Sequence, residues 1–149
     1  MRRMCIFAVC AMAVMLAGCG GSSNNGINGN WTATLTNLDG SVAFTLTATL
    51  TQSNGTLNIT NLSFGASSSC FALGTTATGA FTASGTTNNV TSGTFQMTIQ
   101  SGTANSNGTN QLTLQGILSN NTITGTWTLT GTGSGCTGSG NLTMSNSGQ

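Results

Sequence analysis

Apolar and polar residues alternate one by one along most of this chain, and this period of two constrains the fold more than any other feature. Successive side chains of a β-strand point to opposite faces, so strict alternation indicates a strand with one buried and one solvated face. The pattern occurs in eight segments: residues 31–36, 44–51, 56–60, 75–83, 93–100, 111–116, 122–130 and 140–145. Threonine is the usual polar partner, and its branched Cβ suits a pleated, solvated surface. We therefore predict an all-β domain of about eight strands.

The phase of the alternation assigns each side chain to the inside or the outside of this domain. Five aromatic residues lie on the apolar face and are the candidate interior or ligand contacts: Trp31, Phe44, Phe81, Phe95 and Trp127. Ala83 falls on the same face, whereas Ile117 is out of phase near the end of its strand. Large side chains at inward positions favour a filled interior.

Turn residues separate the predicted strands at Asp39-Gly40, at Asn54-Gly55, and in the stretches 84–89 and 119–121. Short strands joined in sequence by short turns are typical of an antiparallel meander. Closing the meander into an up-and-down barrel leaves no unpaired edge, so we predict an eight-stranded barrel, with a two-sheet β-sandwich as the alternative. An outer-membrane barrel is disfavoured because threonine and glutamine would face lipid.

Ionisable side chains are almost absent from this chain. It contains two basic residues, Arg2 and Arg3, one acidic residue, Asp39, and no histidine or tyrosine. General acid–base catalysis needs a titratable group, and a hydroxyl nucleophile needs an adjacent base. Zinc needs three or four nitrogen, sulfur or carboxylate ligands, and nucleic acid is bound through lysine and arginine. This composition argues against an enzyme, against a metal or other cofactor, and against a nucleic-acid partner.

The N-terminal segment has the pattern of a secretory signal peptide. Arg2 and Arg3 precede an uncharged apolar run over residues 4–16, which ends in small residues. A helix needs about 20 apolar residues to span a bilayer, so the run is too short to remain as a transmembrane helix. A buried N-terminal helix is the alternative, although the segment lacks a polar face.

Leu16-Ala17-Gly18-Cys19 stands at the end of this run and resembles the lipobox of bacterial lipoproteins. The resemblance covers residues 1–19 and implies cleavage before the cysteine. It also implies a thioether-linked diacylglycerol on Cys19 and an acyl chain, such as palmitate, on its amino group. Several acyl chains together anchor a protein stably, so the implied partner is the membrane.

The lipobox implies a division of the chain into three parts. Residues 1–18 are the signal peptide, residues 19–28 are the lipidated cysteine with a flexible Gly/Ser/Asn tether, and residues 29–149 are a single barrel domain. Gly20 stands where lipoproteins retained in the inner membrane carry aspartate. The resemblance thus implies a protein that is exported and anchored to the bacterial cell envelope, at the outer membrane.

A second resemblance concerns the barrel itself. Gly29-Asn30-Trp31 at the start of the first strand is similar to the Gly-x-Trp motif of lipocalin and avidin barrels, and Gly125-Thr126-Trp127 repeats the spacing. The basic residue that covers the lipocalin tryptophan has no counterpart here, and neither has the C-terminal helix. The resemblance supports a barrel and implies a small-ligand carrier as one alternative function.

The cysteines predict one disulfide. Of the five, Cys5 and Cys10 belong to the signal peptide and Cys19 to the lipobox, which leaves Cys70 and Cys136. Export places these two in an oxidising compartment. Each lies in a connection from an odd-numbered to an even-numbered strand, and in a meander all such connections share one end of the barrel. We therefore predict that they pair and tie a lid over that end, with two free thiols as the alternative.

These observations favour a non-enzymatic envelope or surface lipoprotein that acts as a structural or interaction module. The alternative is a lipocalin- or avidin-like carrier, because an eight-stranded barrel is either filled by side chains or able to hold one small molecule. Carbohydrate binding through exposed asparagine and threonine stays open, with Phe71 the one aromatic residue expected on the surface. No residue pattern identifies the protein or small-molecule partner.

Overall fold

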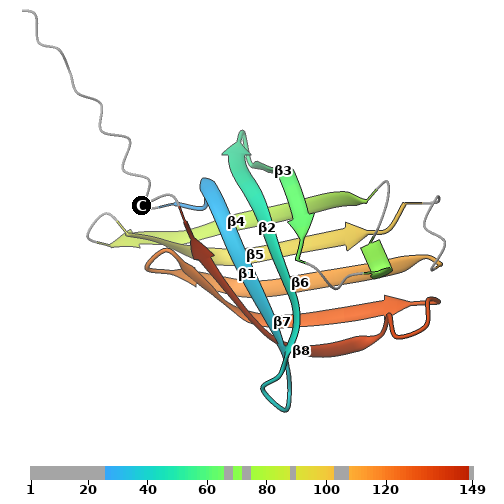
Figure 1. The fold of residues 1–149 in the computed structure, drawn as a ribbon. Helices are drawn as coiled ribbons and strands as arrows, with labels where there is room; N and C mark the ends of the chain where they lie inside the picture. The colour runs from blue at the N-terminus through green and yellow to red at the C-terminus, as the bar shows by residue number, and fades with distance from the viewer. Residues whose placement is uncertain (1–25, 66–68, 72–74, 88–89, 103–107, 148–149) are drawn as a thin grey trace, which may run out of the picture.

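The computed structural model of this chain describes residues 26–65, 69–71, 75–87, 90–102 and 108–147. Within them the chain forms β1 (Gly29–Asn37), β2 (Val42–Ser53), β3 (Thr56–Phe64), the short 3-10 helix η1 (Ser69–Phe71), β4 (Thr76–Thr87), β5 (Val90–Gln100), β6 (Asn110–Ser119), β7 (Thr122–Gly131) and β8 (Gly138–Asn146). Each strand pairs antiparallel with its neighbours in the chain, and β8 pairs with β1 to close the barrel (Figure 1). The predicted up-and-down barrel is confirmed, and the sandwich alternative is wrong.

The expected signal peptide over residues 1–18, its lipobox, and residues 19–25 of the expected tether lie outside the described residues. The described part contains no helix with the length and apolarity needed to cross a membrane.

Two hairpins turn on pairs of residues with positive φ, at positions where the sequence predicts turns. Asn54 (φ 50°) and Gly55 (φ 80°) connect β2 to β3, and Asn120 (φ 49°) and Asn121 (φ 60°) connect β6 to β7. A two-residue turn with positive φ at both positions matches the right-handed twist of the flanking strands. Asparagine and glycine adopt that conformation more readily than other residues, so these short sequences set the register of both hairpins.

The barrel turns a corner between β3 and β4. β1 and β2 cross over the long strands β4–β7 at a steep angle, and β3 diverges from β4 (Figure 1). Among the described residues, β3 and β4 share one register pair, Leu57 with Gly79. A Cβ at Gly79 would lie 2.9 Å from Cδ1 of Ile59, so the glycine lets the side chains of β3 rest directly on β4.

The inward-facing side chains form one continuous core along all eight strands. Its fully buried members include Trp31, Leu35, Leu46, Leu50, Met97, Ile99, Leu112, Leu114, Leu118, Ile123 and Leu129. Ile117 is 59% exposed, as its phase predicts. The expectation that Ala83 is buried is wrong. It pairs with Gly93 in unbroken register with Phe81, but its side chain is exposed, because β4 has here passed beyond its pairing with β3.

Candidate functional site

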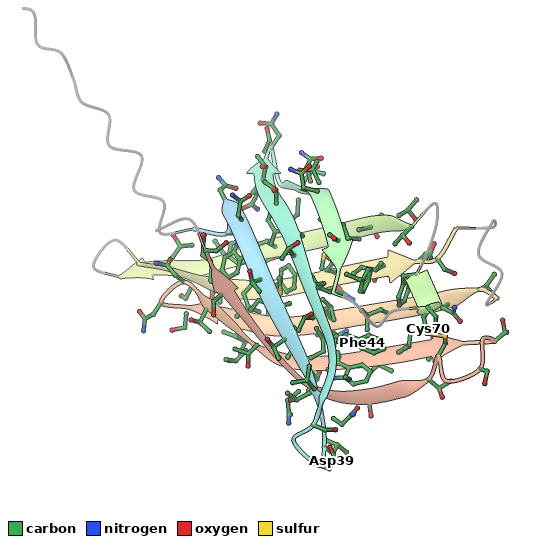
Figure 2. The ribbon with its side chains drawn as sticks, viewed as in Figure 1. Asp39, Phe44 and Cys70 are labelled. Carbon is green, nitrogen blue, oxygen red and sulfur yellow. A yellow bond between two sulfur atoms is a disulfide. The ribbon has the colours of Figure 1, made fainter. Side chains whose placement is uncertain are left out.

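Trp127 of β7 contacts three other strands, β1, β2 and β8. Its Nε1–H donates to the carbonyl oxygen of Thr36 on β1 at 2.9 Å, across the intervening strand β8. Gly140 makes this crossing possible, because a Cβ there would collide with the Thr36 carbonyl oxygen and lie 2.8 Å from Nε1 of Trp127. The half-buried ring of Phe44 meets the indole edge-on, with ring centroids 5.7 Å apart and planes at 89° (Figure 2). This geometry is favourable for aromatic pairs and packs β2 against β7.

Trp31 is fully buried, and its indole is satisfied by the segment just before β1. Its Nε1–H donates to the carbonyl oxygen of Ile27 at 2.8 Å, and Ile27 itself is 2% exposed. The expected flexible tether over residues 19–28 therefore does not extend to its predicted end, because Ile27 is part of the core. A lone apolar residue in a run of glycine, serine and asparagine was the available signal for this contact.

The other two candidate interior residues, Phe81 and Phe95, lie directly opposite each other on β4 and β5 and are buried. A Cβ at Gly93 would lie 2.6 Å from Cζ of Phe81, so the absence of a side chain there makes room for the ring. The five candidate residues thus occur as a Trp127–Phe44 pair, a Phe81–Phe95 pair and Trp31. All are packed against the barrel's own residues.

The predicted disulfide between Cys70 and Cys136 is present and joins η1 to the connection between β7 and β8 (Figure 2). The two Cα atoms are 5.8 Å apart, and both cysteines are buried. The expectation that Phe71 is exposed is wrong. Its side chain is 5% exposed and stacks on Phe64 of β3, with centroids 4.8 Å apart and planes at 5°. The disulfide holds η1 close to the barrel, and this places the neighbouring Phe71 over the interior.

Asn110 is the one buried polar residue in the described ranges, and sequence reasoning missed it. Its Nδ2–H donates to the carbonyl oxygen of Cys70 at 3.0 Å, and its Oδ1 accepts from the N–H of Gly133 at 3.3 Å. The amide therefore connects the start of β6 to both segments that the disulfide joins. Its surrounding stretch of serine, glycine, threonine and asparagine has no periodicity that distinguishes it.

Asp39 lies at the tip of the β1–β2 hairpin, away from the aromatic residues (Figure 2). Its Oδ1 accepts hydrogen bonds from the Ser41 hydroxyl at 2.6 Å and from the Ser41 N–H at 2.9 Å. These bonds, the hydroxyl first, hold the pKa of the carboxyl below its ordinary value of 3.8. The carboxylate thus stabilises a turn.

The described ranges contain no group of three or more histidine, cysteine, aspartate or glutamate residues that could hold a metal ion.

Comparison with known proteins gives no match to a family model, to a curated protein or to a solved structure.

Proposed function

We propose that this protein is a non-enzymatic, lipid-anchored module of the bacterial cell envelope, held at the outer membrane through Cys19, that recognises its partner with its outer surface. The lipobox at residues 16–19 supports the anchor. Asp39, the single acidic side chain of the chain, is engaged by Ser41 in a hairpin turn, which supports a role without acid–base chemistry.

The observation that carries the outer-surface role is the bonding of the two indole groups. Ligand cavities use a few precisely placed polar groups to orient what they bind. Here the Nε1–H groups of Trp31 and Trp127 both donate to main-chain carbonyl oxygens of the barrel. The buried amide of Asn110 bonds to η1 and to the β7–β8 connection. The polar groups that a lipocalin-like carrier would direct at a ligand thus serve the fold, which favours a structural core over a carrier.

Metabolic labelling with a clickable palmitate analogue tests the anchor. The full-length protein, expressed in a Gram-negative host, should incorporate the label and fractionate with outer membranes. Cys19→Ala should lose the label and accumulate as unprocessed precursor. The double variant Cys70→Ala/Cys136→Ala is the matched control, because it removes two cysteines of the same chain and should keep the label. Equal labelling of Cys19→Ala and wild type would overturn the proposal.

A further inference from the structure

The outward face of β5 and β6 carries a regular array of amide and hydroxyl side chains. Three pairs of residues lie directly opposite each other on these strands and form what we call the amide ladder: Gln96–Gln115, Thr98–Thr113 and Gln100–Gln111. Adjacent strands are about 4.8 Å apart, and four residues along a strand span about 13 Å, so two glutamine pairs stand about 13 Å apart with a threonine pair between them. Within the described part of the chain, none of the six side chains forms a hydrogen bond.

Each glutamine pair lines a hollow on the outside of the barrel. The hollow at Gln96 and Gln115 has a volume of about 530 Å³, and its lining also includes Gly116 and Gly125. The hollow at Gln100 and Gln111 has a volume of about 670 Å³. Both volumes fall within the range of about 300–1,000 Å³ that is usual for small-ligand sites.

The chemistry of the lining selects a neutral, polyhydroxylated ligand. A glutamine amide both donates and accepts hydrogen bonds, as does a threonine hydroxyl, and no residue that lines either hollow is ionisable. A charged ligand would lose hydration without gaining an opposite charge. Sugar hydroxyls supply donors and acceptors at short intervals, and the exposed side chain of Ile117 offers an apolar contact for the C–H face of a ring.

The separation of the two hollows indicates an extended ligand that runs along the strands. A second copy of this chain is a poorer fit, because two hollowed faces leave voids when they are placed against each other. We propose that the amide ladder binds a neutral glycan chain, with one part of the chain at each glutamine pair. The proposal rests on the proposed function in one respect, since an envelope location brings the protein into contact with such polymers.

Glycan binding by the purified full-length protein, in a polyoxyethylene detergent, tests this site. The probes are dextran, glucomannan, arabinogalactan and chitohexaose, with polygalacturonate as the charged counterpart, each titrated by calorimetry at low and high salt. We expect at least one neutral probe to bind with an affinity that salt does not change, because no ion pair contributes. Gln96→Ala/Gln115→Ala should weaken this binding about tenfold or more, through loss of hydrogen bonds from both amides.

The matched control is Asn58→Ala/Asn141→Ala, which removes two exposed amides of β3 and β8 that line neither hollow. The control should bind as wild type does, and both double variants should keep the wild-type melting temperature, since the substituted side chains are exposed. Failure of all four neutral probes, preference for polygalacturonate, or equal weakening by the control would overturn the proposal. Binding without lipid on Cys19 would contradict only the anchor, whereas a lipidated protein that binds no glycan would contradict only this site.

Discussion

At the scale of single residues, several close contacts in the barrel depend on glycines, which leave room for a neighbouring group. Gly140 lies where the indole of Trp127 reaches across β8 to the carbonyl oxygen of Thr36. Neither alternation nor turn chemistry identifies such a glycine, because the feature that requires it comes from a different strand. Trp127 is recognisable in the sequence as an inward-facing residue, but its partners are not.

Gly140→Ala should therefore destabilise the barrel by about 1–3 kcal/mol, the usual cost of inserting a methyl group into a packed site. Gly85→Ala is the matched control, because a Cβ there would have no heavy atom within 4 Å, and its effect should stay within about 0.5 kcal/mol. Urea unfolding of both variants measures the difference. Equal stability of the two would contradict the close approach of Trp127 to β8.

Asp39 gives the chain a simple dependence on pH. Its pKa is lowered in the folded protein, so its stabilising contribution is present above the ordinary value of 3.8 and is lost as the pH falls through the lower folded value. The melting temperature should be constant from about pH 5 to 8 and should decrease only below about pH 4. Asp39→Asn should abolish the decrease at low pH. A melting temperature of the wild type that changes near neutral pH would contradict the assignment of the pH dependence to Asp39.

At the scale of elements, prediction from the sequence succeeded where the period of two was local. The strands, the Asn54-Gly55 turn and the outward direction of Ile117 follow from neighbouring residues alone. The sequence did not predict the burial of Ile27 or Phe71, because both residues lie outside the segments with a period of two. The exposure of Ala83 depends on how far β4 extends past its pairing with β3, which the sequence of β4 alone does not show.

The disulfide was predictable because strand parity places Cys70 and Cys136 at the same end of a meander. It closes a loop with a sequence separation of 66 residues, for which chain entropy predicts a stabilisation of about 4 kcal/mol. Small domains are stable by about 5–15 kcal/mol, and the strands bury a continuous core without the bridge. Reduction should therefore lower the melting temperature and leave a folded barrel at 25 °C.

Thermal melts with and without reductant, together with Cys70→Ser/Cys136→Ser, measure this effect. The double variant should melt at the same temperature with and without reductant. Two free thiols in the unreduced, denatured wild type would contradict the bridge, and complete unfolding on reduction at 25 °C would show that the core cannot support the barrel by itself.

At the scale of the whole molecule, the inside and the outside of the barrel carry different kinds of side chain. The inside holds the aromatic pairs, the indole hydrogen bonds and the amide of Asn110, all of which bond or pack within the chain. The outside carries uncharged amides and hydroxyls, arranged by the strand register into rows. This division supports our proposal of an envelope module that recognises its partner with its outer surface.

Hydrogen exchange of the two indole N–H groups, followed by NMR on the full-length protein, tests this division most directly. A structural core predicts that both indole protons persist as long as the slowest backbone amides, because Trp31 and Trp127 release their carbonyl partners only when the barrel opens. Exchange of either indole proton at a rate close to that of free tryptophan would show that the interior is open to solvent, and would favour a ligand carrier instead.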